Sequence, residues 1–145
     1  MRELPRELSV AELGELFEGR TRLVEALATV EDPLGRADEV LGSLTHDEKV
    51  EALNAHPPIG ARRLSRRSAS EQGNEADPVV LSELAYLNQV YEEKFGFRFV
   101  VFVAGRPRRA ILDVLRERIG RSGEEELEEG CRELVAIARD RWQQG

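Results

Sequence analysis

Residues 97–105 read FRFVVFVAG, and the fold class depends on how this stretch is interpreted. Its aromatic and β-branched residues are typical of a β-strand. The remainder of the chain offers no second strand as a partner, and an isolated strand is not stable in water. We therefore predict that the stretch is a buried extended or helical segment that runs through the core of an all-α protein.

Helices are predicted on both sides of this segment. Before it, Asp77 is a suitable N-cap, Pro78 fits the first helical position and Gly96 fits the position just after the last turn. The inner face of this helix is predicted to carry four residues at helical spacing, Leu81, Leu84, Leu87 and Tyr91. After the segment, helices are predicted over about 107–119 and 122–143. The second of these should bury Leu127, Cys131, Leu134, Val135 and Ile137.

The N-terminal half has the same helical character. Ser9 with Glu12, and Thr45 with Glu48, have the spacing of a capping box, so each pair predicts the start of a helix. Two further helices are predicted over 21–30 and 36–44. The periodicity predicts that Leu13, Leu16, Phe17, Leu23, Val24, Leu27, Val50 and Leu53 face inward. Together these patterns predict a single-domain helical bundle over residues 1–145, with about seven or more helices.

Length and charge restrict the kind of protein. The chain has 145 residues, enough to bury a core without disulfides or a structural metal. Its net charge is −7, from 28 acidic and 21 basic residues, which argues against a general DNA- or membrane-binding surface. No apolar run resembles a signal peptide or a membrane span. The sequence therefore predicts a cytoplasmic protein with no nucleic-acid or membrane partner.

The main candidate for chemistry is His56, in the stretch LNAHPPIG at 53–60. Pro57 disfavours helical geometry in the residue before it, so the helix that starts near Thr45 must end at or before His56. The imidazole is thus expected at a helix C-terminus, followed by a long stretch without periodicity. Histidine exchanges protons near neutral pH, because its reference pKa is about 6.5. A structural role remains the commoner alternative for a lone histidine.

Other polar residues have simpler interpretations. Ser68 and Glu71 have capping-box spacing and could do no more than start a short helix. His46 falls at the start of a helix and is predicted to be solvated, as is the group of arginines between 62 and 67. Cys131 is predicted to be a buried core residue, because no second cysteine or zinc-type spacing is present. The sequence predicts no metal site.

Three segments, taken in order, resemble one family. They are NAHPPIG at 54–60, SASEQ at 68–72 and LNQVYEEKFGFRFVVFVAGR at 87–106. They are similar to the motifs of the 2-oxo-4-hydroxy-4-carboxy-5-ureidoimidazoline (OHCU) decarboxylases of urate degradation, and the likeness runs from about residue 8 to 142. Two departures stand out. Pro58 replaces the aspartate or arginine of other members, and GNEADP after Gln72 makes a shorter connection to the next helix.

The resemblance implies an all-helical, cofactor-free enzyme, usually a homodimer, that converts OHCU to (S)-allantoin and carbon dioxide. By motif, His56 would be the catalytic acid and Glu71 would orient the substrate. The substrate contacts that the same motifs imply are Pro57, Ser68, Ala69, Ser70, Glu71, Gln72, Phe99, Val100, Val101, Phe102, Val103 and Arg106. Arg106 has a second interpretation, as a residue that only caps the following helix.

The substrate of this family explains why no cofactor is implied. Its carboxylate lies on a carbon next to a ring imine, so the ring itself takes up the electron pair, and the protein has only to orient the ring and handle protons. The alternative hypothesis is a non-catalytic helical domain that binds a ureide or acts as an adaptor. Faster reaction with one allantoin enantiomer in excess would distinguish the enzyme from the binding domain.

Overall fold

The computed structural model describes residues 3–57 and 77–145, and these residues form seven helices and no strand. The all-α prediction is therefore confirmed for the described part of the chain. The helices, in order, are α1 (Val10–Phe17), α2 (Arg22–Leu27), α3 (Ala37–Gly42), α4 (His46–Asn54), α6 (Pro78–Phe95), α7 (Arg108–Ile119) and α8 (Gly123–Gln144).

The predicted helix starts are confirmed where a side chain caps the helix. Ser9 and Thr45 each accept a hydrogen bond from the backbone N–H of the glutamate three residues later, and that glutamate bonds back to the cap. Asp77 caps α6 by accepting from the N–H of Val79 at 2.9 Å. Gly96 ends α6 with a φ of 80°, a left-handed conformation that glycine adopts without strain.

The helix predicted over 21–30 is shorter in the structure, since α2 ends at Leu27. After it the N–H of Thr29 bonds to the carbonyl of Ala26 at 3.1 Å, and the Thr29 hydroxyl bonds to the same carbonyl at 2.7 Å. These contacts replace the next α-helical hydrogen bond with a tighter turn. Residues 28–30 therefore leave the helix before the proline at position 33 is reached.

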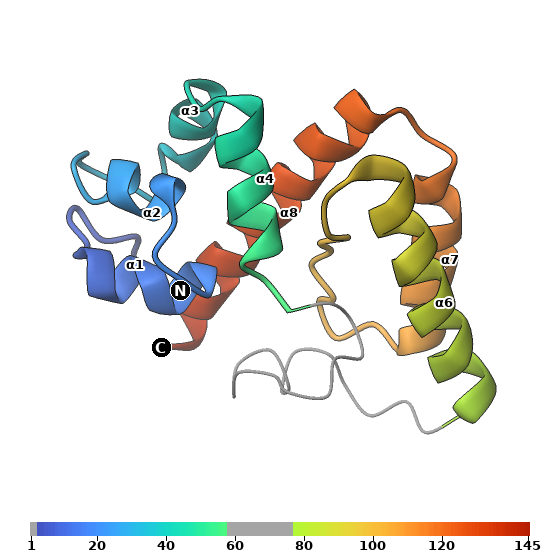
Figure 1. The fold of residues 1–145 in the computed structure, drawn as a ribbon. Coiled ribbons are helices and arrows are strands. Elements are labelled where there is room, and N and C mark those ends of the chain that lie inside the picture. Colours follow the sequence, from blue (N-terminus) through green and yellow to red (C-terminus); the bar gives the residue numbers. More distant parts are fainter. Residues whose placement is uncertain (1–2, 58–76) are drawn as a thin grey trace.

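Helix α8 is the central element of the fold. It packs against α1, α3 and α4, while α6 and α7 pack against each other. Figure 1 shows α8 running diagonally between the N-terminal helices and the α6–α7 pair. The first and last described parts of the chain meet, because the Trp142 indole N–H donates to the carbonyl of Glu3 at 2.8 Å. One cluster of buried hydrophobic side chains includes members of every described helix.

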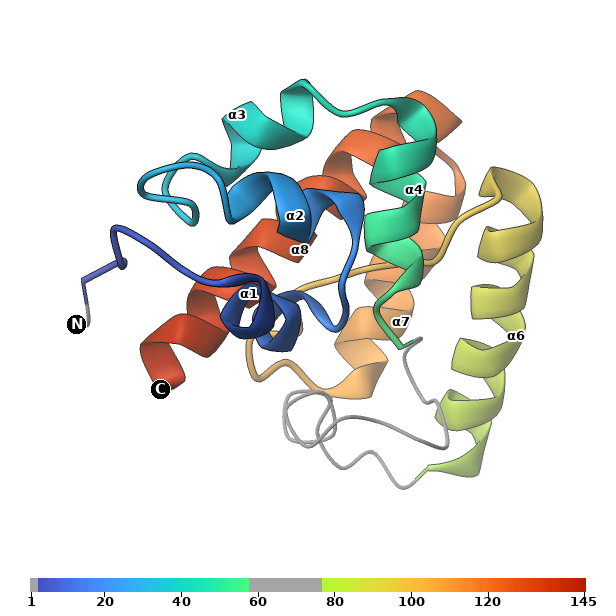
Figure 2. The same cartoon turned by 60° about the vertical axis from the view of Figure 1, so that its left-hand side comes forward.

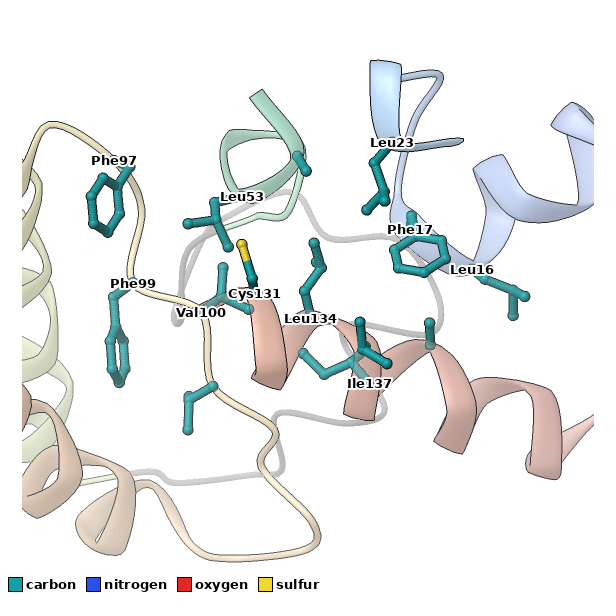
Figure 3. Packing of buried hydrophobic residues seen from close by; sticks show 14 of the residues in the cluster. Leu16, Phe17, Leu23, Leu53, Phe97, Phe99, Val100, Cys131, Leu134 and Ile137 are labelled. Atoms are coloured by element: carbon teal, nitrogen blue, oxygen red, sulfur yellow. The ribbon is translucent and has the colours of Figure 1, made fainter. Parts of the chain in front are cut away.

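Residues 97–103 form the buried extended segment that the sequence predicts. Figures 1 and 2 both show this part of the chain between the α6–α7 pair and the rest of the molecule. Phe97 and Phe99 lie edge-on to the ring of Tyr91 in α6, with centroid distances of 6.0 and 5.3 Å. In Figure 3 these two rings point toward α6, whereas Val100 points toward Leu53 of α4. The segment therefore joins two groups of helices.

The buried face of α6 differs from the predicted one. Leu84 and Tyr91 are buried as predicted, but Leu81 and Leu87 are only half-buried. The buried positions of the helix are Val80, Leu84, Asn88 and Tyr91. At 3.6 residues per turn, Leu81 and Leu87 lie about 60° to either side of Leu84, at the edges of the buried stripe. Leucines spaced three residues apart therefore turn progressively away from the buried face of the helix, so only Leu84 lies at its centre.

Candidate functional site

His56 lies immediately after the C-terminal end of α4. Ala55 is the C-cap of the helix, and the His56 N–H donates to the carbonyl of Leu53 at 3.1 Å, so the predicted helix end is confirmed. The side chain is buried, with 5% of its surface exposed. Its Nε2 atom has no hydrogen-bond partner among the described residues. A buried polar atom without a partner is unfavourable, so a ligand that bonds to Nε2 would be favoured here.

The surroundings of His56 keep its imidazole neutral at neutral pH. Burial lowers the pKa of His56 from 6.5 to about 4, and the positive charge of Arg141 acts in the same direction. The negative charge of Glu18 opposes this shift. Arg141 and Glu18 are themselves paired, with 3.1 Å between Nη2 and Oε1. A neutral imidazole has one nitrogen that donates and one that accepts, so this group can take up a proton.

The extended segment supplies a mostly apolar surface close to His56. Of the predicted contact residues, Phe99, Val100, Val101 and Val103 are buried and Phe102 is half-buried. Several of their backbone groups already have partners. The carbonyl of Val100 accepts from Arg118 Nη1 at 2.8 Å, and the N–H of Phe102 donates to Glu133 Oε1 at 3.2 Å. The hydrogen bonds of the described residues involve neither peptide group of Val101.

Arg106 turns back on the same segment. Its Nε donates to the carbonyl of Val103 at 3.0 Å and its Nη2 to that of Phe102 at 2.6 Å. The N-cap of α7 is Pro107, which makes no side-chain capping bond. In this structure Arg106 therefore fixes the end of the segment and does not cap the helix.

A buried polar network beneath the segment is absent from the sequence-based prediction. Arg118 and Glu126 are both buried, and Arg118 Nε lies 2.7 Å from Glu126 Oε1. The Tyr91 hydroxyl donates to the same oxygen at 2.7 Å. The Arg118 guanidinium also lies 4.7 Å from the centre of the Phe99 ring. Arg118 lies in α7 and Glu126 in α8. Both helices contain many charged residues, so the sequence pattern alone did not indicate which two point inward.

Several predicted site residues lie outside the described part of the chain. They are Ser68, Ala69, Ser70, Glu71 and Gln72. The arginines between 62 and 67 also lie outside the described part of the chain. The predicted role of Glu71, to orient the substrate, therefore remains a prediction. Pro57 follows His56 directly, as the motif requires, and His46 is exposed at the start of α4, as predicted.

Two other classes of site have no support in residues 3–57 and 77–145. These residues contain no group of three or more His, Cys, Asp or Glu side chains placed to hold a metal ion. None of their helices is long and apolar enough to cross a membrane. Cys131 is buried as predicted, and burial raises the pKa of its thiol to about 11. The thiol is therefore protonated at neutral pH and unsuited to act as a nucleophile.

Proteins of known structure share this fold. A crystal structure of OHCU decarboxylase in the presence of (S)-allantoin matches 89% of this chain and 93% of that chain, with a TM-score of 0.75 and 24% identity. A crystal structure of (S)-allantoin synthase matches 94% of this chain and 50% of that chain, with a TM-score of 0.69 and 22% identity.

Sequence relatives and the family model agree with the motifs. A uric acid degradation bifunctional protein from Bacillus sp. (strain TB-90) is 26% identical over 95% of this chain, which spans 30% of that protein. The chain likewise spans about 30% of the bifunctional relatives from Arabidopsis thaliana and Bacillus subtilis. The OHCU decarboxylase of Haloferax volcanii is 28% identical over 86% of this chain and 81% of its own length. Because the OHCU decarboxylase family model matches residues 2–143, the chain belongs to the OHCU decarboxylase family.

Proposed function

We propose that this chain is a cofactor-independent decarboxylase that converts OHCU to (S)-allantoin and carbon dioxide in urate degradation. In this proposal His56 is the catalytic acid and Glu71 orients the substrate. The observation that carries the proposal is the buried Nε2 of His56, which has no partner among the described residues of a chain that matches this family over 2–143. A substrate hydroxyl would supply the missing hydrogen bond.

The reaction needs no group beyond the substrate ring and a means of moving protons. The bond between ring carbon and carboxylate breaks, and its electron pair forms a double bond to the neighbouring carbon while the imine nitrogen gains a proton from water. The product of this step is an enol. It becomes allantoin when its hydroxyl loses a proton and the neighbouring carbon, which bears the ureido group, gains one.

His56 is suited to the second step. Because burial keeps the imidazole neutral, Nε2 can accept the hydroxyl proton. The imidazolium that forms is a strong acid in this apolar position, so it returns a proton readily, now to carbon. Delivery from one fixed side of the ring yields one enantiomer. General acid–base catalysis of this kind contributes about 10²–10⁴-fold in rate.

The extended segment would form the opposite wall. Val101, whose two peptide groups make no hydrogen bond among the described residues, would offer them to the polar edge of the flat ring. We assign Ser68, Glu71 and Gln72 to the remaining polar groups of the substrate, as the family motif implies. In this arrangement the end of α4 and the extended segment would hold the ring between them, which lowers the entropy lost on the way to the transition state.

A coupled assay tests the proposal. Urate, uricase and hydroxyisourate hydrolase generate OHCU in the cuvette, and circular dichroism follows (S)-allantoin. The wild-type chain should accelerate formation of one enantiomer, whereas the uncatalysed reaction gives a racemate. His56→Asn should lose about 10²–10⁴-fold in kcat. His46→Asn is the matched control, because His46 is the other histidine and is exposed.

Two results would contradict the proposal. Full activity in His56→Asn would remove this residue from the mechanism. Stabilisation by allantoin or another ureide, without acceleration or an excess of one enantiomer, would identify the chain as a ureide-binding domain instead.

The proposal includes a homodimer. Val79 and Tyr86 are large hydrophobic residues of the described surface that remain well exposed, at 64% and 66%. They are seven residues apart in α6 and so lie on one face of that helix. An exposed apolar pair of this kind supports a contact with a second copy of the chain.

A further inference from the structure

We propose that Arg98 is a positioning residue for the decarboxylation, one that fixes the backbone of His56 against the extended segment. Arg98 Nη1 donates to the carbonyl of His56 at 2.7 Å and to that of Asn54 at 2.8 Å. These carbonyls lie at the C-terminal end of α4, where the helix itself supplies no donors. The inference rests on the proposed function, because His56 is catalytic only under that proposal.

Arg98 is held to α4 by its own backbone as well. Its N–H donates to Oδ1 of Asn54 at 3.0 Å, so Arg98 donates both to the side chain and to the backbone carbonyl of Asn54. Glu92 of α6 pairs with the same guanidinium, with 3.6 Å between its Oε1 and Arg98 Nε. The guanidinium is therefore oriented from both helices, and Asn54, Glu92, Phe97 and Arg98 line a small pocket of about 270 Å³.

Because side chains alternate along the extended segment, Arg98 faces α4 while its neighbours face α6. Successive side chains of an extended segment point to opposite sides. Phe97 and Phe99 point toward Tyr91 of α6, as Figure 3 shows, and Arg98 between them reaches α4. One residue thus links the helix end that carries His56 to the segment proposed as the opposite wall of the site.

An arginine is well matched to this position. Its positive charge is favourable at a helix C-terminus, and a planar guanidinium can donate in several fixed directions. Loss of these bonds would let the His56 backbone move relative to the wall. Because a misplacement of about 1 Å can reduce a rate about 10²-fold, the effect should fall on kcat. Substrate binding uses many other groups, so KM should change little.

The test compares two arginines of equal exposure in the coupled assay. Arg98 and Arg139 each have 37% of the side chain exposed. Arg139 also donates to a backbone carbonyl, that of Leu34 at 2.9 Å, and pairs with Asp38, but it makes no described contact with residues 54–56. We expect Arg98→Ala to lower kcat about 10–100-fold, with KM changed less than about threefold. Arg139→Ala should stay within about twofold of wild type.

Two further variants separate positioning from general support of the fold. Arg98→Lys keeps a charge near the carbonyls and should recover part of the lost kcat. Asn54→Ala removes only the acceptor of the Arg98 N–H and should lower kcat about 3–10-fold, which keeps the inference testable if Arg98→Ala does not fold. Equal losses of kcat in Arg98→Ala and Arg139→Ala, or a loss carried by KM alone, would overturn the inference.

A readout without turnover distinguishes failure of the inference from failure of the proposed function. Diethylpyrocarbonate modifies neutral imidazole, and mass spectrometry separates the products at His56 and His46. In wild type the buried His56 should react slowly and the exposed His46 quickly. Arg98→Ala should accelerate the reaction of His56 alone. If wild type does not accelerate formation of (S)-allantoin, the proposed function fails, and unchanged reactivity of His56 in Arg98→Ala would show separately that Arg98 does not fix it.

Discussion

Arg118 of α7 and Glu126 of α8 form a buried ion pair, with 2.7 Å between Nε and Oε1 and side-chain exposures of 3% and 0%. The pair lies under the extended segment, because Arg118 also donates to the carbonyl of Val100. Nη2 of Arg118 and Oε2 of Glu126 have no hydrogen bond within the described residues. A pair of this kind is worth little compared with apolar packing, but losing one partner leaves a buried charge uncompensated.

Glu126→Ala should therefore destabilise the protein strongly. The substitution leaves the Arg118 charge buried and removes the acceptor of the Tyr91 hydroxyl. We expect the free energy of unfolding to fall by about 3–5 kcal/mol, measured by urea titration with far-UV circular dichroism.

Glu129→Ala in the same helix is the matched control. Glu129 also accepts from an arginine at 2.7 Å, Arg132, but that arginine has 61% of its side chain exposed. The loss should be at most about 1 kcal/mol, since water screens the pair. Similar losses in the two variants would show that the Arg118–Glu126 pair is not shielded from solvent.

Gly130→Ala should destabilise the contact between α4 and α8. A Cβ at this position would come within 3.1 and 3.2 Å of the two terminal carbons of Leu53, which is fully buried, so we expect its neighbours to restrict its movement. Overpacking of this kind reduces stability by about 1–3 kcal/mol, and replacing glycine in a helix returns about 1 kcal/mol, so we expect a net loss of up to about 2 kcal/mol. Because Leu53 is three residues from His56, kcat in the coupled assay should fall as well.

Gly42→Ala provides the comparison, because a Cβ there would meet nothing within 4 Å. It should leave the melting temperature unchanged or raise it slightly, and kcat should not change. A Gly130→Ala variant as stable as Gly42→Ala would mean that α4 and α8 can separate without loss, contrary to the packing described.

Local rules predict most of the fold. The capping boxes at Ser9 and Thr45 give the starts of α1 and α4, and Pro57 gives the end of α4. The absence of a partner strand correctly predicts the extended core segment. These features depend on residues a few positions apart, so they can be predicted without knowledge of tertiary contacts.

The charged residues inside the fold were not predicted, although their helical spacing from apolar residues indicates that they lie on the buried faces. Glu126 shares a face with Gly130 and Leu134, and Arg118 shares one with Leu115, and all are buried. These helices carry many charged residues, so each charged residue considered alone is predicted to be exposed to solvent. The contact of Arg98 with the His56 carbonyl spans 42 residues and leaves no local pattern, so only the structure could reveal it.

Tyr86→Glu tests the proposed homodimer. Tyr86 is 66% exposed, so the substitution should not disturb the core, while a buried charge in a dimer contact would weaken it by several kcal/mol. Sedimentation velocity at micromolar concentration should show a dimer for wild type and a monomer for the variant. Ala85→Glu, on a neighbouring exposed position of the same helix, shows how far the contact extends. A wild-type monomer, or a Tyr86→Glu dimer, would contradict the proposed contact.

Burial of His56 should make stability depend on pH. Its pKa is 6.5 in the unfolded chain and about 4 in the folded protein, so the unfolded state binds more protons between these values. The stability that comes from keeping the imidazole neutral is complete above pH 6.5 and is lost as the pH falls toward 4; its full size is about 3 kcal/mol.

Carboxylates titrate in the same range, so the measurement is the difference in unfolding free energy between wild type and His56→Gln, from urea titrations at pH 4 to 8. Relative to His56→Gln, wild type should lose about 3 kcal/mol on going from pH 7 to 4, whereas His46→Gln should follow wild type throughout. Parallel curves for wild type and His56→Gln would mean that the imidazole protonates freely in the folded protein, and would remove the basis for assigning it a neutral resting state.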